Sequence, residues 1–304
     1  MGLSLDHAGT RLAYSVLVSH SNIWSIEIPR SGPISIAGAR PVTSGNQIIE
    51  NVDVSRDGRW LAFDSDRGGN FDIFKTPVDG GEVVQITTDP GMDFLPRWSP
   101  DGRAIAFHSM RAGNRDVFTI AADGSGEAQH TRAPEEEWQQ AWSADGQALV
   151  FRVESLKRAY LHILPLAGDG SPQDLKVDVG SGASVLNAPS WSPTAGAICY
   201  SSPRGLGVLD VASGEDRILV APSQGPLFPV WAPDGRTIYY LASGPSTRSI
   251  RSVPAEGGTT RRLVDFDDAS RPYTRYGFAA GGHRFYVTLG TLESDVWVMK
   301  LERR

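Results

Sequence analysis

The sequence contains little cysteine and few charged residues. Cys199 is the single cysteine among 304 residues, which excludes a disulfide or a cysteine metal cluster within the chain. It stands in the apolar run AICY, where we expect a small buried side chain. Charged residues make up only 21%, whereas the chain has 33 glycines and 20 prolines. This balance favours turn-rich β structure over long helices.

The chain also lacks a basic surplus and a long apolar segment. Its formal net charge is −6, which argues against a partner made of nucleic acid or anionic lipid. No apolar stretch approaches 18 residues, so we expect no insertion into a membrane. The opening residues MGLSLDHAGTRLAY show no basic segment followed by an apolar one, so no signal peptide is visible.

Common catalytic motifs are missing as well. No GxSxG, HExxH, P-loop or CxxC pattern occurs, so the sequence predicts no catalytic residue and no cofactor. The histidines never fall within four residues of one another, so their spacing predicts no metal site. They stand at positions 7, 20, 108, 130, 162 and 283. A fold that gathers residues from distant repeats keeps a shared metal site open as an alternative.

What the chain does contain is a long repeat. The segment WSPDGRAIAF at 98 recurs in similar form as VSRDGRWLAF at 54, WSADGQALVF at 142, WSPTAGAICY at 191 and WAPDGRTIYY at 231. Two weaker copies flank these five, and the spacings between anchors are 49, 44, 44, 49, 40 and 47 residues. The seven anchors are Leu5, Val54, Trp98, Trp142, Trp191, Trp231 and Phe278. A period of this length is typical of a propeller or a solenoid.

Asp-Gly corners mark strands inside each repeat. They occur at 57, 79, 101, 123 and 145, each 22 residues after the last, and Asp-Gly between β-rich runs indicates a hairpin. One repeat predicts four strands at Phe94–Ser99, Ala104–Ser109, Asp116–Ile120 and Gln129–Thr131. The sequence therefore predicts an all-β fold, a seven-bladed β-propeller of four-stranded antiparallel blades. A β-sandwich, which shows turn signals without a fixed long period, is the weaker alternative.

The repeat also predicts the organisation of the chain and of its ends. We expect a single propeller domain over residues 1–304, with blades at about 1–44, 45–88, 89–132, 133–178, 179–221, 222–265 and 266–304. The chain stops after a third strand at Asp295–Leu301, so the last blade is expected to lack its outer strand. We expect a fragment of a larger protein whose upstream residues supply that strand; an autonomous chain is the alternative.

Four of the eight tryptophans share the anchor position of the repeat. They are Trp98, Trp142, Trp191 and Trp231. Burial of each ring between neighbouring blades removes roughly 150–250 Å² from water, worth about 4–6 kcal/mol as an upper estimate. We therefore expect these rings to hold the blades together rather than to form a stacking platform for a ligand.

The repeat resembles the TolB-type, WD-like β-propeller repeat of bacterial proteins. The resemblance is carried by WSPDGRAIAF followed by SxRxGxxD, as in FDSDRGGNFDIFKTPVDGG at 63–81 and FHSMRAGNRDVFTIAADGS at 107–125. Members of this family are similar in fold but serve as periplasmic docking proteins, as sensor halves of kinases and regulators, and as gating domains of peptidases. The resemblance implies a location outside the cytoplasm, in the periplasm or at the cell surface; a cytoplasmic one is the alternative.

Candidate binding residues precede the anchors. Loops that enter the inner strands of a propeller are expected to gather at the mouth of its channel, where they mix aromatic, acidic and basic side chains. The candidates are Asp93, Phe94, Glu137, Trp138, Phe228, Tyr273 and Arg275. A purely structural role, as loop caps or packing between blades, is the alternative for each of them.

These features predict a binding or sensor module without catalytic activity. We expect it to dock a protein or peptide, or a small ligand, at the channel mouth, and to be a monomer or to be fused to an upstream domain. Two alternatives remain open: a polysaccharide lyase or hydrolase with a metal recruited from scattered histidines, and an accessory propeller of a peptidase or kinase whose catalytic domain is absent.

Overall fold

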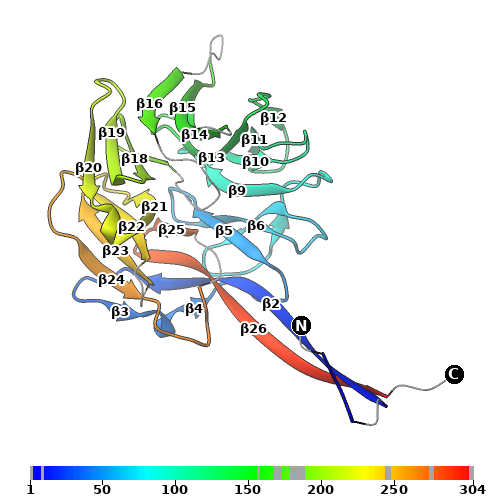
Figure 1. Cartoon of the computed structure of the whole chain (residues 1–304). Helices are drawn as coiled ribbons and strands as arrows, with labels where there is room; N and C mark the ends of the chain where they lie inside the picture. The colour runs from blue at the N-terminus through cyan, green and yellow to red at the C-terminus, as the bar shows by residue number, and fades with distance from the viewer. Residues whose placement is uncertain are drawn as a thin grey trace.

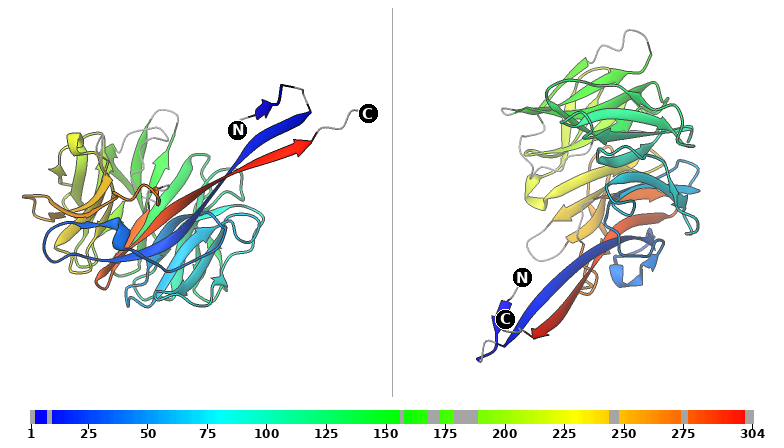
Figure 2. Two further views of the ribbon diagram at one scale, coloured as in Figure 1. Left: turned by 90° about the horizontal axis from the view of Figure 1, so that it is seen from below. Right: turned by 90° about the vertical axis from the view of Figure 1, so that its right-hand side faces the viewer.

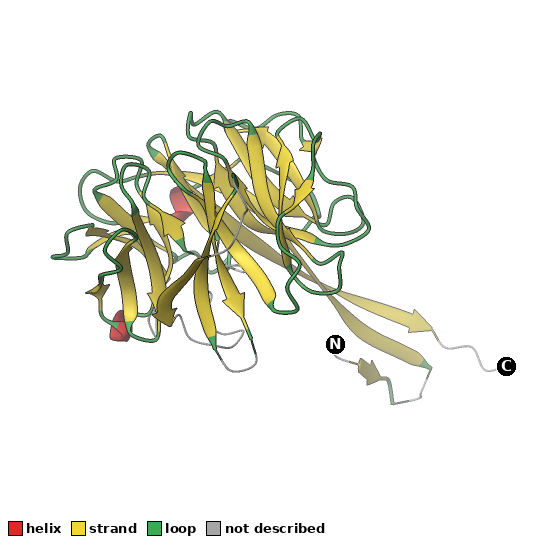
Figure 3. Ribbon diagram, turned by 90° about the horizontal axis from the view of Figure 1, so that it is seen from above, coloured by secondary structure: helices red, strands yellow, loops and turns green. Residues whose placement is uncertain are grey.

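The computed structural model describes residues 3–7, 10–155, 158–167, 173–178, 189–243, 248–273 and 277–300. In this part of the chain nearly all regular structure is β-strand, with two single-turn 3₁₀ helices, η1 (Ile36–Gly38) and η2 (Pro222–Gln224) (Figure 3). The strands form antiparallel sheets arranged around a common centre (Figure 1). The predicted all-β propeller of four-stranded blades is confirmed.

Five sheets are each built from one repeat, with the strands in chain order. Three of them contain β5 (Ile49–Val54), β6 (Trp60–Ser65), β7 (Asp72–Pro77) and β8 (Val84–Gln85); β9 (Asp93–Trp98), β10 (Ala104–Ser109), β11 (Asp116–Ala121) and β12 (Ala128–Gln129); and β13 (Glu136–Trp142), β14 (Ala148–Glu154), β15 (Ala159–Pro165) and β16 (Gln173–Asp178). The other two contain β17 (Ser190–Trp191), β18 (Ala197–Ser202), β19 (Gly205–Asp210) and β20 (Asp216–Val220); and β21 (Pro226–Trp231), β22 (Thr237–Ser243), β23 (Arg248–Pro254) and β24 (Arg261–Asp265).

The sixth sheet joins the two ends of the chain. Its strands are β25 (Phe278–Gly281), β26 (Arg284–Lys300), β2 (Arg11–Glu27) and β1 (Leu3–Leu5), and β4 (Arg40–Pro41) also pairs with β2. The short strand β3 (Ile34–Ser35) adds to the edge of β24 in parallel. Each blade can bury its faces only against its neighbours, so this shared sheet is what closes the ring.

The sheets of the described part of the chain differ from the predicted blades in two respects. It forms six sheets rather than seven, because the first and last repeats, predicted as blades 1–44 and 266–304, share one sheet. The last blade also does not lack its outer strands, since β2 and β4 follow β26 in the sheet. The repeat signal located the strands correctly but did not reveal which strands would pair.

Six apolar clusters fill the six interfaces between neighbouring sheets. In one of them Trp98 packs with Phe107 against Ala62 of the preceding sheet. The indole N–H of Trp142 donates to the carbonyl oxygen of Arg97 at 3.0 Å, again across an interface. Trp231 likewise donates to the carbonyl oxygen of Ser190 at 3.0 Å. The predicted role of these tryptophans between blades is therefore confirmed.

The corners after three of the inner strands are each closed by a serine and an aspartate. Ser99 Oγ donates to Asp101 at 2.7 Å and accepts from the backbone N–H of Ala104 at 2.9 Å. Gly102 follows with φ of 70°, a left-handed conformation that costs a residue with a Cβ about 1–2 kcal/mol. The same contacts recur at Ser55 and Ser143. This geometry explains why Ser-x-Asp-Gly recurs along the sequence.

The inner strands are bulged three residues before their anchors. Leu95, Gln139 and Phe228 have φ of 55°, 59° and 47°, and the strand register shifts at each of these positions. The backbone N–H of Leu95 donates to Asp64 of the neighbouring sheet at 2.9 Å. Asp64 is fully buried and also accepts three bonds from residues 50 and 51 of its own sheet, so it fixes the bulge from across the interface.

A long two-stranded ribbon extends from the ring. β2 and β26 each have 17 residues and are paired from Arg11↔Lys300 to Glu27↔Arg284, a length of about 55 Å. One half of the ribbon belongs to the ring, and the other half projects away from it with β1 along its side (Figure 2). We call this projecting half the arm; it contains residues 3–5, 11–19 and 291–300.

The corner geometry generates a stability prediction. Gly102→Ala should lower the free energy of unfolding by about 1–2 kcal/mol, because φ is positive there although the space around a Cβ is open. Gly196, in the corresponding corner of another repeat, has equally open space without a positive φ. Gly196→Ala should therefore change stability by less than about 0.5 kcal/mol. Urea unfolding of both variants is the measurement, and equal losses would contradict the assignment.

Candidate functional site

A cavity of about 200 Å³ lies where the innermost strands of all six sheets end. Every sheet contributes the last residues of its inner strand or the corner that follows. The lining residues are 53–56, 97–100, 141–144, 189–193, 229–231, 233, 278, 280 and 281. The cavity is therefore one mouth of the central channel, on the side of the Pro-Asp-Gly corners.

The four anchor tryptophans line this mouth. Trp98 and Trp231 are buried, with 8% and 7% of their surface exposed, whereas Trp142 and Trp191 are half-buried. Each ring therefore has two roles: it packs between two sheets and also forms part of the cavity wall. The sequence analysis assigned only the first role. The missed signal was that one side chain per repeat, placed at the end of each inner strand, must meet its equivalents at the axis.

One arginine spans the mouth. Arg56 belongs to the corner after β5, and its Nη2 donates to the carbonyl oxygen of Pro193 at 3.4 Å. Pro193 follows β17, whose sheet lies three places around the ring from the sheet of β5. The exposed guanidinium thus crosses from one side of the cavity to the opposite side. A long bond from an exposed side chain is easily exchanged for another partner.

A carboxylate and a second arginine also line the cavity. Asp53 accepts a hydrogen bond from the backbone N–H of Trp98 at 2.8 Å, and Arg97 Nη1 lies 4.0 Å from its other oxygen. Burial raises the pKa of the Asp53 carboxyl. The mouth therefore combines indole faces, proline rings, two guanidinium groups and one carboxylate. This mixture suits an extended chain with aromatic and charged groups.

The predicted site residues lie at the other ends of the inner strands. Asp93 is fully buried at the start of β9, where Arg111 Nη2 reaches its two oxygens at 3.1 and 3.2 Å. Phe94 stacks between Phe71 and His108, at 4.8 and 5.8 Å between ring centres. Burial lowers the pKa of His108 to about 3, so this imidazole is neutral at pH 7.

The neighbouring sheet adds Glu137 and Trp138. Glu137 is buried, and Trp138 lies under the guanidinium groups of Arg115 and Arg152 at 4.9 and 5.5 Å. His108 contacts Trp138 edge-on at 6.2 Å between ring centres. The structure thus brings Phe94 and Trp138 together through one histidine, inside an interface between sheets.

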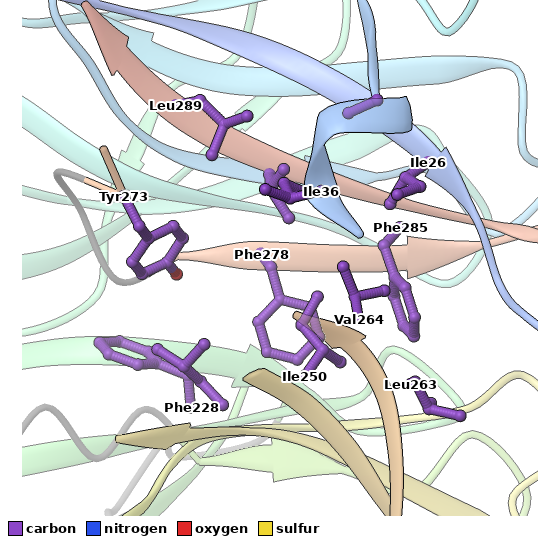
Figure 4. Close-up of a cluster of buried hydrophobic side chains, with 13 residues drawn as sticks. Ile26, Ile36, Phe228, Ile250, Leu263, Val264, Tyr273, Phe278, Phe285 and Leu289 are labelled. Atoms are coloured by element: carbon purple, nitrogen blue, oxygen red, sulfur yellow. The ribbon is translucent and has the colours of Figure 1, made fainter. Parts of the chain in front are cut away.

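The remaining candidates belong elsewhere. Phe228 and Tyr273 are buried in the apolar cluster between the sheets of β21 and β25 (Figure 4). Arg275 lies outside the described residues. None of the described candidates lines the cavity, because the prediction used the loops that enter the inner strands whereas the cavity lies where those strands end.

The described residues offer no cluster of donors for a metal. Among them, no three His, Cys, Asp or Glu side chains lie close enough together to hold an ion. No helix in the described part of the chain is long and apolar enough to cross a membrane.

Asp93 gives the stability of the fold a measurable pH dependence. Burial raises its pKa from 3.8 to about 6, against hydrogen bonds such as that from Ser109. A raised carboxyl pKa stabilises the fold below pH 3.8, and this stabilisation is lost as the pH rises through 6. The free energy of unfolding should therefore fall by about 1 kcal/mol between pH 5 and 7 through this group. Asp93→Asn should remove that part of the slope in urea unfolding; an unchanged slope would contradict the assignment.

Two solved structures show the same architecture. A candidate TolB from Agrobacterium tumefaciens is similar with a TM-score of 0.71 and 16% identity, covering 90% of this chain and 98% of that one. TolB from Acinetobacter baumannii is similar with a TM-score of 0.61 and 18% identity, covering 84% of this chain and 66% of that one. At such identities the likeness shows the fold alone.

Sequence comparison identifies the family. An uncharacterized protein of Agrobacterium fabrum, Atu1656, is 39% identical over 59 residues, which is 19% of this chain and 20% of that protein. The match thus spans about a fifth of the relative's length. The family described as TolB beta propeller domain matches residues 39–227 and 85–273, which overlap and together cover most of the chain. The predicted resemblance is therefore confirmed, and the chain belongs to the TolB beta propeller domain family.

Proposed function

We propose that the chain is a binding module without catalytic activity, which holds an extended segment of a protein or peptide at the channel mouth. The observation that carries this proposal is the cavity wall itself, to which all six sheets contribute and in which four tryptophans recur. Tryptophan and arginine are the side chains most enriched at binding hot spots. The cavity replaces the predicted loop residues as the proposed site.

The size of the cavity favours a segment over a small cofactor. A volume of about 200 Å³ accommodates one or two side chains, below the 300–1,000 Å³ usual for drug-sized ligands. The rest of the segment would lie across the corners around the mouth. No cofactor is part of this proposal.

Arg56 gives the site a preference for acidic partners. Its bond to the neutral carbonyl of Pro193 is long and exposed. A carboxylate forms shorter, charge-assisted bonds, about twice as strong as neutral ones. A partner with an acidic side chain or a free C-terminus would therefore replace the carbonyl of Pro193 as the hydrogen-bond partner of Arg56 and open the mouth.

We also propose that the chain is located outside the cytoplasm, as the resemblance to periplasmic docking proteins implies.

Selection of peptides tests the site directly. A display library of random linear peptides, selected on the chain, should yield binders that lose affinity at least tenfold on Trp191→Ala, because that half-buried ring would no longer pack against the peptide. Val84→Ser, on the outer strand β8, is the matched control and should bind as the parent chain does. Binders equally affected by both variants, or by neither, would contradict the proposed site.

Arg56 has a control within the same corner. Arg56→Gln should weaken acidic peptides from that selection about tenfold and leave neutral ones unchanged, in titrations followed by tryptophan fluorescence. Arg59, which bonds Asp57 at 2.6 Å and does not line the cavity, should tolerate the same change. Equal losses for Arg56→Gln and Arg59→Gln would reduce the effect to general surface charge. A higher salt concentration should weaken the binding of only those peptides whose affinity depends on Arg56.

A further inference from the structure

The arm exposes apolar side chains that the rest of the protein buries. Leu3, Leu5, Val298 and Met299 are 70%, 60%, 65% and 48% exposed, more than any other large apolar residue described. Leu5 and Met299 occupy the repeat positions of Trp98 and Ile120, which are only 8% and 4% exposed in their own sheet. These residues therefore stand in positions that elsewhere lie between blades.

Strand pairing follows one register in four of the five middle repeats. The residue nine places after the anchor pairs with the residue twenty places after it. The pairs are Phe63↔Phe74, Phe107↔Phe118, Phe151↔His162 and Tyr240↔Arg251, whereas a shorter hairpin in the repeat of Trp191 pairs Tyr200 with Gly207. In each blade a hairpin loop, such as residues 110–115, connects the second strand to the third.

The ribbon pairs the corresponding strands with exchanged partners, at an offset one residue shorter than in those repeats. Nine places after the first and last anchors stand Tyr14 and Val287, and nineteen places after them stand Trp24 and Trp297. The structure pairs Tyr14 with Trp297 and Trp24 with Val287. Each half of the ribbon is thus a normal pair of second and third strands, but one strand comes from the first repeat and the other from the last.

A hydrogen-bond signature marks the point in β2 where a third strand should begin. The backbone N–H of Ile23 donates to Thr43 Oγ1 at 2.9 Å, and this hydroxyl donates to Asn22 at 3.1 Å. The same arrangement begins the third strands β7 and β11, directly after their hairpins. It involves Asp72, Ile73 and Thr87 in one sheet and Asp116, Val117 and Thr131 in the other.

We propose that the ribbon is one of two arrangements of the chain ends. In the other, β2 folds back at residues 17–21 and β26 at residues 290–294. Residues 11–16 then pair with 22–27, and residues 284–289 pair with 295–300, so that the shared sheet divides into two blades. The register between strands is the same in both arrangements, and only the loops and the partners change.

The two arrangements differ in exposed surface and in the channel. Folding back brings the apolar residues of the arm into an interface between blades and removes the projecting edge, a device that also limits aggregation. It also adds a blade to the ring beside β25, whose residues 278, 280 and 281 line the cavity. The exchange therefore changes the width of the mouth. This inference stands independently of what the mouth binds.

Engineered disulfides distinguish the arrangements. Arg11, Glu27 and Lys300 are all exposed, and Cys199 is buried, so new cysteines are clean probes. Arg11→Cys with Lys300→Cys joins neighbours of the ribbon, whereas Arg11→Cys with Glu27→Cys joins residues about 50 Å apart in it. Only the folded-back arrangement makes residues 11 and 27 cross-strand neighbours, within the roughly 4.5–5.5 Å that a disulfide spans.

The expected result is an intramolecular disulfide in both double variants after mild oxidation. Thermal melting of each reduced variant at the parental midpoint shows that the substitutions leave the fold intact. Formation of the 11–300 disulfide alone would overturn the proposal, since the ribbon would then be the single arrangement. A disulfide between residues 11 and 27 of two different molecules would overturn it too, because the arm would then exchange between copies.

Discussion

The fold depends on closure of the ring. A single blade buries its faces only against the blades on either side, so an unclosed ring would leave two apolar faces in water. The pairing of β2 with β26 supplies the closure, and it joins the two most distant parts of the described chain. Residues such as Ile23 and Tyr286 then pack against the sheet of β5, and Ile26 and Phe285 pack against that of β21. In the ribbon arrangement, the pairing of the ends thus supports both neighbouring interfaces.

The interactions that hold the blades together also build the candidate site. The anchor tryptophans pack between sheets, and the indole N–H groups of Trp142 and Trp231 are fixed by the carbonyl oxygens of Arg97 and Ser190. The remaining edge of the ring reaches the channel. A partner bound there meets side chains that are already ordered, so little conformational entropy is lost on binding. Stability and recognition therefore draw on the same residues, and truncating Trp98 or Trp231 would damage both.

Strand positions were predictable from the sequence because their signals are local. Ser99, Asp101 and Gly102 close a corner through bonds within five residues, and this pattern is visible in the letters. The contacts made at the starts of the inner strands were harder to predict from the sequence. Asp93 and Trp138 were predicted from the loops that enter the inner strands, and they lie at that end of β9 and β13, where they contact Arg111 and Arg115. Such contacts join residues about twenty apart and depend on how hairpins pack, which spacing alone does not reveal.

The number of blades was not predictable for a different reason. Seven repeats specify seven sets of strands, but a strand of correct register accepts any partner with that register. In the middle repeats the choice is made by hairpins such as MRAGNR, where Gly113 has φ of 102° and turns the chain back. The first repeat has Leu-Val-Ser-His-Ser at residues 17–21, without a glycine, and β-branched Val18 favours an extended backbone. A weak turn makes the straight strand competitive, and the nearest strand of equal register is the one at the other end of the chain.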